Sequence, residues 1–375
     1  MFLKYSGLQS GKVNILYLIQ VPPPLHGVSK LNDFIYKSEQ INKAYNKQKV
    51  ELKFSDNLSE LSNFSFKKIL FFVRVIKNLI FKLISHKPDL VYFTIVPTGV
   101  SFYRDLVFVF ILKFFRKKIV YHFHGQGVPQ FVTSRLNTVL YNWLLKKAYV
   151  IHLSKGLLEK EFESLKIKKS KSYFVNNGVD DLNISPVYSK EKVCNILFFS
   201  NKFPSKGVFI LLDVLAKIKK EGLDFKLIFI GGSAGQDVDD DIKAKIINEN
   251  LDSNINLLGG IYTDEKYAYF ENADIFIHPT LNDALPLVLL DAMQFGLPII
   301  SSKIGAIPEI IEDEKNGFLT EPGDIDKITS DLIKLLTDDG MRKEMGIHSR
   351  KRFLENYTIG CFEKELKSVF TKIIK

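Results

Sequence analysis

The chain has 375 residues, of which 46% are hydrophobic, 13% aromatic and 25% charged, and this composition excludes an intrinsically disordered or collagen-like protein. The length exceeds what one compact core accommodates and favours two domains of roughly 150 to 200 residues each. The charge is unevenly divided, because residues 1–190 contain 29 Lys and Arg against 12 Asp and Glu, a balance of +17, whereas residues 191–375 have a balance of −7.

The N-terminus and the cysteines bear on the compartment. Residues 1–20 lack the basic region, the continuous apolar run and the small-residue cleavage site of a signal peptide. No uninterrupted apolar run of roughly 18 or more residues occurs, so we expect no membrane-spanning helix. Cys194 and Cys361 have no partner motif, which excludes a disulfide framework and suits a reducing compartment. We therefore expect a cytoplasmic protein.

Apolar strand-like runs alternate with amphipathic segments along the whole chain, which is the pattern of βαβ units on a parallel sheet. In the first half, strands are expected at residues 13–20, 89–96, 118–124, 149–154 and 172–178. In the second half, they are expected at residues 194–200, 224–232, 255–260, 274–280, 297–303 and 317–322. The predicted fold class is α/β, with two doubly wound, Rossmann-like domains that face each other across a cleft at the carboxyl ends of their strands.

The connection between the two domains is predicted from composition. Residues 180–193 are polar and turn-rich and include Pro186. We expect an N-terminal domain at residues 1–185, a C-terminal domain at residues 186–358, and a helix at residues 359–375 that packs back toward the N-terminal domain.

Two predicted helices of the first half combine aromatic and basic residues. Residues 64–84 place Phe, Leu, Ile and Val beside Lys and Arg, and residues 102–118 end in FFRKK. Such helices can lie against a membrane interface with basic side chains toward phosphates. Packing against the sheet is the favoured alternative for most of the apolar residues, and it leaves the lysines unexplained. The basic half thus suggests anionic lipid, lipid phosphate or nucleic acid as a neighbour, with solvated lysines as an equal alternative.

Loops after strands hold the candidate site residues of the first half. Gly27 follows the first strand and opens a helix, where a glycine lets backbone approach a phosphate or a sugar. A tight turn explains it equally well, since the dinucleotide fingerprint is absent. His122 and His124 lie on one side of a strand, and His124 is at its carboxyl end, so a functional role is as plausible as packing. No zinc site is expected, because no ligand partners lie at suitable spacing.

Similar loops occur in the second half. Lys206 precedes a helix, where its charge adds to that of the helix end and suits a pyrophosphate, although an exposed turn lysine is the alternative. Gly232 follows a strand and allows close approach of a ligand. The run DVDDD at residues 237–241 resembles a metal-binding D-x-D. We favour helix N-terminal acids as its explanation, so no metal is expected.

Taken in order, these features resemble the retaining glycosyltransferases of family four, which have the two-domain GT-B fold. The most specific stretch is DIFIHPTLNDALPLVLLDAMQFGLPIISSKIGAIPEII at residues 274–311, similar to the family's proline-serine, E-x7-E, E-A-M, G-x-P and G-x-x-E pattern. NNGVDD, NGFLTEPGD and RKEMGIHSRKRFLENYT at residues 176–181, 316–324 and 342–358 are similar to further family signatures. The resemblance covers essentially the whole chain.

The resemblance implies roles for individual residues. Asp283 and Asp291 take the places of two family glutamates, of which the first contacts the donor sugar and the second the nucleotide ribose. Lys206 matches the lysine that holds the donor diphosphate, His124 a histidine near the anomeric centre, and Gly27 a glycine loop facing the phosphates. Backbone N–H groups complete the implied phosphate site, at Leu285, Pro286, Leu287 and Val288, where proline itself has only its carbonyl.

Three departures from the family pattern bear on activity. Both glutamates are aspartates, one methylene shorter. The family arginine five positions before the lysine is Asn201, which removes one of two positive charges, and the adjacent Lys202 is the candidate to replace it. The proline-serine pair reads Pro279-Thr280, which keeps the hydroxyl.

The resemblance implies a metal-independent, retaining transfer of a sugar from a UDP- or GDP-sugar without a cofactor. The implied acceptor is a glycan, which we expect to be lipid-linked at the inner face of the cell membrane during bacterial surface polysaccharide assembly. The basic N-terminal domain would then contact anionic lipid peripherally. A nucleotide-sugar epimerase of the same fold and a non-catalytic partner subunit are the alternatives. Nucleic-acid binding is not expected, because the basic half lacks a recognised reader motif.

Overall fold

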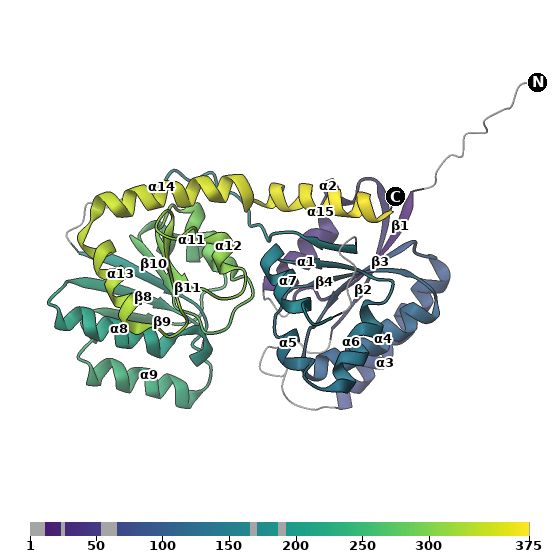
Figure 1. Cartoon of the computed structure of the whole chain (residues 1–375), viewed down its shortest axis with the longest axis horizontal. Helices are drawn as coiled ribbons and strands as arrows, with labels where there is room; N and C mark the ends of the chain where they lie inside the picture. The colour runs from purple at the N-terminus through teal and green to yellow at the C-terminus, as the bar shows by residue number, and fades with distance from the viewer. Residues whose placement is uncertain (1–11, 24–26, 54–65, 166–170, 187–192, 375) are drawn as a thin grey trace, which may run out of the picture. The chain divides into compact units, whose positions relative to one another are not determined.

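The computed structural model describes residues 12–23, 27–53, 66–165, 171–186 and 193–374, and the chain divides into two compact units (Figure 1). Unit 1 comprises Met1–His152, Leu158–Val175 and Glu363–Lys375, and unit 2 comprises Leu153–Leu157 and Asn176–Phe362. Among the described residues, no helix combines the length and the apolar character needed to cross a membrane.

The chain enters unit 2 at Asn176, earlier than the predicted boundary at residues 185 and 186. The described beginning of the polar stretch predicted as a connection, residues 180–186, belongs to unit 2. Val179 N–H donates to the carbonyl of Tyr357 at 3.1 Å, and Asp181 pairs with Arg350 at 2.8 Å. These contacts explain why composition alone places the boundary too late.

Unit 1 contains a six-stranded parallel sheet in the order β2-β1-β3-β4-β5-β6. Its strands are β1 (Val13–Ile19), β2 (Tyr45–Glu51), β3 (Leu90–Ile95), β4 (Lys118–Phe123), β5 (Tyr149–His152) and β6 (Ser172–Phe174). Every strand predicted for this half is present. The additional strand, β2, lies at the edge of the sheet and is mostly polar, and Val50 is its only fully buried residue. The strand β2 is therefore recognised by its hydrogen bonds to β1 and not by an apolar pattern in its sequence.

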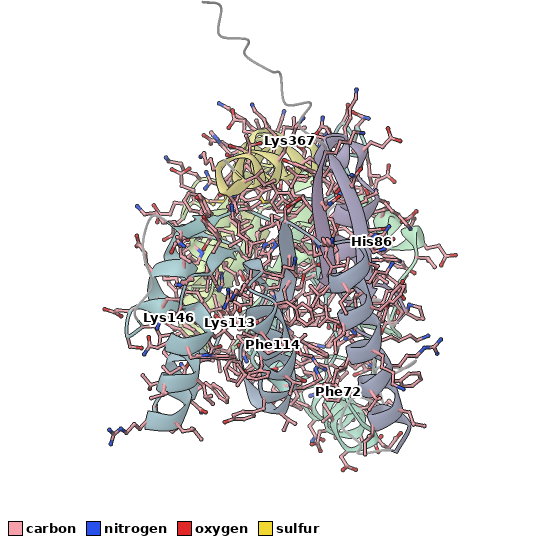
Figure 2. The ribbon with its side chains drawn as sticks, turned by 90° about the vertical axis from the view of Figure 1, so that its right-hand side faces the viewer. Phe72, His86, Lys113, Phe114, Lys146 and Lys367 are labelled. Atoms are coloured by element: carbon pink, nitrogen blue, oxygen red, sulfur yellow. The ribbon has the colours of Figure 1, made fainter. Side chains whose placement is uncertain are left out.

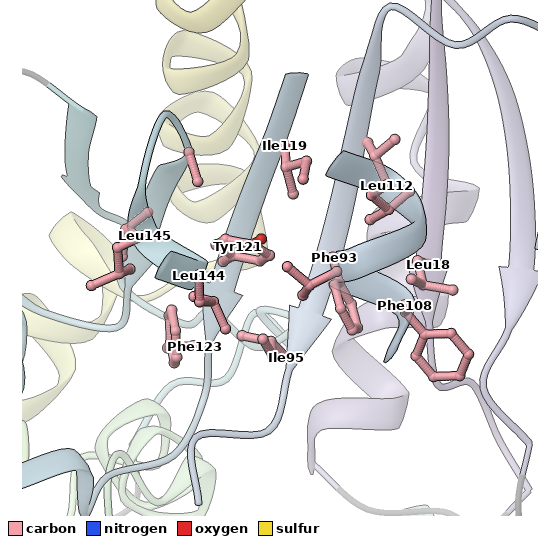
Figure 3. Packing of buried hydrophobic residues seen from close by; sticks show 14 of the residues in the cluster. Leu18, Phe93, Ile95, Phe108, Leu112, Ile119, Tyr121, Phe123, Leu144 and Leu145 are labelled. Carbon is pink, nitrogen blue, oxygen red and sulfur yellow. The ribbon is translucent and has the colours of Figure 1, made fainter. Parts of the chain in front are cut away.

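Helices cover both faces of this sheet (Figure 1). The helices of this half of the chain are α1 (Gly27–Lys37), α2 (Glu39–Asn42), α3 (Phe66–Ser85), α4 (Gly99–Phe114), α5 (Val128–Phe131), α6 (Arg135–Leu145) and α7 (Lys155–Phe162). Alternate strand residues such as Leu18, Phe93 and Tyr121 pack against α3, α4 and α6, where Phe108 and Leu144 are fully buried (Figure 3). This cluster is the main apolar core of unit 1.

The opposite face of the first sheet receives the last helix, α15 (Ile359–Ile374). The ring of Phe370 lies 5.7 Å from that of Tyr92 and 6.3 Å from that of Tyr45, between centroids. At the start of this segment Ser38 donates to a carboxylate oxygen of Glu363 at 2.5 Å. The final residues of the chain therefore complete the core of unit 1.

Buried histidines lie within β4, at His122, and at the end of β5, at His152. The Nδ1 of His122 lies 2.5 Å from the hydroxyl of Tyr92, and its ring centroid is 4.0 Å from that of His124. Burial, followed by the neighbouring histidines, holds the pKa of His122 well below its usual range. Burial and the charge of His124 lower the pKa of His152 to about 3. Both His122 and His152 are therefore neutral in the folded protein at physiological pH.

We expect unit 1 to lose stability as the pH falls from about 7 to about 5, because the unfolded chain gains protons on these histidines near pH 6.5 and the folded chain does not. Since the folded state binds fewer protons in this window, its stability rises with pH. Melting temperatures measured across the window should depend less on pH in His152→Gln. His348→Gln, an exposed histidine of unit 2, is the matched control. Equal pH dependence in both variants would contradict the assignment.

Unit 2 contains a second six-stranded parallel sheet in the order β12-β11-β10-β7-β8-β9. Its strands are β7 (Cys194–Phe199), β8 (Phe225–Ile230), β9 (Ile255–Leu258), β10 (Ile275–His278), β11 (Ile299–Ser302) and β12 (Gly317–Thr320). All are at predicted positions and slightly shorter than predicted. The chain leaves β7 toward β8 and β9 and later returns to the other side of β7 with β10. The strand order thus reverses between β7 and β10.

The helices of unit 2 pack on both faces of its sheet, around two apolar clusters. They are η3 (Pro204–Lys206), α8 (Val208–Lys220), α9 (Gln236–Asn248), η4 (Asp264–Lys266), α10 (Tyr267–Glu271), α11 (Leu287–Gln294), α12 (Ile307–Ile310), α13 (Ile325–Thr337) and α14 (Asp339–Asn356). In this arrangement η3 and α11 follow the two strands at which the order reverses.

Candidate active site

The reversal between β7 and β10 brings two predicted site residues together. Lys206 ends η3 after β7, and Asp283 lies in the loop between β10 and α11. In open α/β sheets, ligands bind at the carboxyl ends of strands where the order reverses. The Nζ of Lys206 lies 2.6 Å from Oδ2 of Asp283. It also donates to the carbonyl of Asn282 at 3.3 Å.

A histidine joins this pair. His278 is the last residue of β10, and its Nε2 lies 3.1 Å from the same Oδ2 of Asp283. Burial raises the pKa of Asp283, but the hydrogen bond and charge of His278 and the charge of Lys206 outweigh it, so the pKa is lowered. Asp283 is therefore ionised at neutral pH, and its stabilising contribution is lost only as the pH falls through this lowered pKa.

Two glycines hold the loops of this cluster close together. Gly207 has a φ of 79°, and a Cβ built on it would lie 1.9 Å from the carbonyl oxygen of Pro279. Leu281 N–H donates to the carbonyl of Ser205 at 2.8 Å, which ties the same two loops. Gly305 has a φ of 59°, and its Cβ would lie 2.2 Å from the carbonyl oxygen of Asp283. Neither position accommodates a side chain, so the backbone approach itself places Lys206 beside Asp283.

Helix α11 begins directly after this loop. Pro286 is its N-cap and makes no side-chain cap hydrogen bond, and the helix runs from Leu287. Leu285 and Pro286 are buried, and Leu287 and Val288 are half-buried. Because the first N–H groups of a helix have no intrahelical acceptor and bear partial positive charge, this end suits an anion.

Asp291 lies on α11 and is only 4% exposed. Its carboxylate accepts a hydrogen bond from the Nζ of Lys266, the last residue of η4. A second ion pair thus adjoins the α11 side of the site. It holds Asp291 in a fixed position on a buried helix.

Comparison with known proteins agrees with this geometry. Residues 181–352 match the family model described as Glycosyl transferases group 1. Somewhat less than half of the chain, most of unit 2, is therefore similar to this family.

Relatives of the chain are also glycosyltransferases by name. An uncharacterized glycosyltransferase of Methanocaldococcus jannaschii is 25% identical over 313 residues, which cover 75% of this chain and 76% of that protein. The amylovoran biosynthesis glycosyltransferase AmsK of Erwinia amylovora is 30% identical over 146 residues, 37% of this chain and 35% of that protein. The chain thus spans about a third of the length of this second relative.

Solved structures share the fold of the entire chain. A glycosyltransferase from Rickettsia africae superposes with a TM-score of 0.78 at 19% identity, covering 97% of this chain and 99% of that one. HepE of Anabaena in complex with UDP gives a TM-score of 0.73 at 19% identity, covering 96% and 100%, and HepE is also known with UDP-glucose. These likenesses confirm the predicted two-domain α/β architecture, GT-B.

Within residues 181–352, Asn201 binds the neighbouring loop. Its Oδ1 accepts from the N–H of Gly232 at 3.2 Å and from the hydroxyl of Tyr262 at 3.3 Å. A Cβ on Gly232 would lie 2.4 Å from that hydroxyl. Asn201 thus positions the Gly232 loop, which a neutral amide does without adding charge.

Lys202 has an acidic partner of its own. It is buried, and its Nζ lies 3.3 Å from Oδ1 of Asp239 on the first turn of α9. Asp237 and Asp239 both lie on that first turn, where the helix dipole stabilises acids. In this structure, the acidic run therefore includes the counterion of Lys202.

His124 and Gly27 belong to unit 1. His124 follows β4, and its ring lies beside that of His122, tilted by 38°, on the side that the alternation of the strand predicts. Gly27 is the exposed first residue of α1. Each therefore lies after a strand of the first sheet, as predicted.

Three residues of unit 2 were not predicted from the sequence: His278, Tyr262 and Lys266. His278 ends a strand and was open to the same argument as His124. Tyr262 lies in the loop after β9 and Lys266 at the end of η4, where no residue pattern distinguished them.

Proposed function

We propose that the protein is a metal-independent, retaining glycosyltransferase that moves a sugar from a UDP- or GDP-sugar to a glycan acceptor. The observation that supports it most is the cluster of Lys206, Asp283 and His278 beside the N-terminus of α11, at the reversal of strand order. The relatives named above and the HepE complexes with UDP and UDP-glucose support a nucleotide-sugar donor.

In the proposed reaction, the bond between the anomeric carbon and the diphosphate oxygen breaks, and a bond to the acceptor oxygen forms on the same face of the sugar. The acceptor proton passes to the departing diphosphate. Lys206 has three N–H donors and directs two of them to Asn282 and Asp283. The third can reach the diphosphate together with the first N–H groups of α11, which stabilises the negative charge that develops there.

The aspartates would hold the donor at its two ends. Asp283, kept ionised by its neighbours, accepts from a sugar hydroxyl, and Asp291 accepts from the ribose. Since Lys266 fixes Asp291, the shorter aspartate has a defined position on α11. For His124 and Gly27, which belong to unit 1, the proposed roles are those that the resemblance implies, a histidine near the anomeric centre and a glycine loop facing the phosphates.

We expect Asp291→Asn to raise the donor dissociation constant about tenfold, because a hydrogen bond to a charged group is lost. Isothermal titration with each nucleotide sugar measures this. Turnover at saturating donor should stay near the wild-type value. Asp326→Asn removes an 89% exposed carboxylate of the same unit and is the matched control. Unchanged donor affinity in Asp291→Asn would contradict the ribose assignment.

The acceptor is proposed to be a lipid-linked glycan at an anionic membrane, in surface polysaccharide assembly. The balance of +17 in residues 1–190 and the polysaccharide role in the name of AmsK support this. A screen of purified protein against UDP- and GDP-sugars, with and without lipid-linked acceptors, tests the proposal. Transfer that requires both substrates is expected, whereas turnover of a donor without any acceptor would indicate an epimerase.

A non-catalytic partner subunit is the second candidate, and Asn201 in place of a charged residue favours it. Loss of one cation weakens a diphosphate site. Calorimetry separates the two, because a subunit with an inactive site should bind none of the nucleotide sugars.

A further inference from the structure

Helix α4 exposes a continuous apolar stripe on the side opposite the sheet. The stripe consists of Val100, Tyr103, Val107, Phe110 and Phe114, which are between 40% and 86% exposed. Their spacing of three and four residues places them on one helix face. At 1.5 Å per residue the stripe is roughly 21 Å long. A helix that covers a sheet normally presents polar residues on the side that faces away from the sheet. Helix α4 presents apolar residues there instead.

Helix α3 repeats the pattern. Leu70, Val73, Phe81 and Ile84 are 71%, 42%, 64% and 59% exposed and recur at helical spacing. The buried residues of α3, such as Leu79 and Leu83, lie on the opposite side. The exposed apolar residues are therefore not the core face of this helix.

The stripes belong to one layer of helices. The ring of Phe72 on α3 lies 5.4 Å from that of Phe108 on α4. Tyr103 on α4 donates to Asn137 on α6 at 2.7 Å. Helix α6 adds Leu136 and Val139, which are 64% and 58% exposed. Together these stripes form a single apolar surface on unit 1, which we call the α3-α4-α6 face.

This face has cations and lacks exposed acids. Helices α3 and α6 contain no Asp or Glu, and Asp105 of α4 is fully buried beside Arg104 at 2.7 Å. Arg74 and Lys77 are exposed on α3. At the end of α4, Lys113 donates to the carbonyl of Lys146 at 3.0 Å, and Figure 2 shows both beside Phe114. Apolar side chains edged by cations complement an anionic lipid surface.

A basic pocket opens beside α3. It has a volume of about 610 Å³ between α3 and β2, and Lys49, Arg74 and Lys82 line it with Glu51, which pairs with Lys49 at 2.5 Å. Its cations outnumber its carboxylate. Phosphate oxygens of lipid head groups would contact these cations, while the apolar stripe of α3 lies deeper in the bilayer interface.

We propose that the α3-α4-α6 face is a bilayer-docking surface whose apolar residues enter the interface of an anionic membrane. A bilayer fits better than a second copy of the chain, because the described part of this face offers no carboxylates to pair with its own cations. In the described part of unit 2, by contrast, the exposed large apolar residues are spread over loops and several elements, and α14 is the helix that has two of them, Ile347 and Leu354. The inference gives a location to the membrane contact of the proposed function and rests on that part of it.

Flotation of the full chain with mixed phosphatidylglycerol and phosphatidylcholine vesicles tests the proposal. The double variant Phe110→Ser, Phe114→Ser should lower vesicle affinity about tenfold or more, because two aromatic side chains no longer leave water. Since both are more than 60% exposed, the fold should persist, which circular dichroism and melting temperature verify. Ile347→Ser, Leu354→Ser, which are 51% and 44% exposed on α14, form the matched control and should float like the wild type.

The charge is tested separately with Arg74→Glu, Lys77→Glu, which should weaken flotation with anionic vesicles. Wild-type binding should fall with salt and be weak on pure phosphatidylcholine. Inorganic phosphate should release no more protein from vesicles than sodium chloride does at the same ionic strength, if lipid is the ligand.

Three results would overturn the proposal. One is equal flotation of wild type and the Phe110, Phe114 variant. Another is indifference to lipid charge and salt. The third is a dimer in lipid-free sedimentation that the double variant dissociates while vesicle binding stays unchanged. Binding of UDP-sugars without lipid should be the same in both proteins, so a failure of docking is distinguishable from a failure of the proposed transferase activity.

Discussion

Replacing Lys206 with alanine is expected to lower kcat for sugar transfer by about 10²- to 10³-fold, the effect of removing one donor from a site of developing charge. The loss should appear mainly in kcat, because the diphosphate gains negative charge as the sugar leaves. Asp283 keeps His278 as a partner in the variant, so the loop remains in place. Steady-state kinetics with the preferred donor, once the screen has identified it, measures the change.

The control for this variant is Lys220→Ala. Lys220 lies on α8 of the same unit, is 76% exposed and forms only a long pair with Glu249 at 3.7 Å. Its loss should leave kcat within about twofold of wild type, as for a surface pair of little energetic weight. If Lys206→Ala retained wild-type kcat, the leaving-group assignment would be wrong.

Gly207→Ala is expected to destabilise unit 2 by about 2–4 kcal/mol. A left-handed φ of 79° strains any residue with a Cβ, and here the Cβ would also lie 1.9 Å from the Pro279 carbonyl oxygen. The two loops must separate, which moves Lys206 away from Asp283. The melting temperature measured by calorimetry should fall by roughly 5 to 15 °C. The affinity for the donor should fall as well.

Gly222→Ala separates strain from clash. Gly222 has a similar φ of 74°, but nothing lies within 4 Å of a Cβ built there. We expect a cost of about 1 kcal/mol from the backbone conformation alone and unchanged donor affinity. Equal effects of the two variants would show that the contact between η3 and the β10 loop contributes nothing.

The strands of both sheets were predictable because they are buried on two faces and read as apolar runs. Strand β2 was not, since its edge position leaves most of its residues partly exposed and its alternation is polar. The boundary between the units was placed too late for a related reason. A polar segment looks like a linker in the sequence even when its hydrogen bonds attach it to one unit.

The site was predictable only in part. Lys206 was predicted from its position after a strand and Asp283 from the family resemblance, whereas their 2.6 Å contact depends on Gly207 and Gly305, whose packing is a tertiary property. Lys202 was predicted to supply the positive charge that is missing at Asn201. The structure instead pairs Lys202 with Asp239, a partner on a different helix that local sequence does not reveal.

The packing of α15 has a consequence for biosynthesis. Tyr45 and Tyr92 precede unit 2 in the sequence, but Phe370, whose aromatic ring packs near both of theirs, follows unit 2. Nearly all of unit 2 leaves the ribosome before Glu363. The first sheet therefore lacks the packing of α15 until unit 2 has been synthesised, so the core of unit 1 can be completed only after the chain of unit 2 is made.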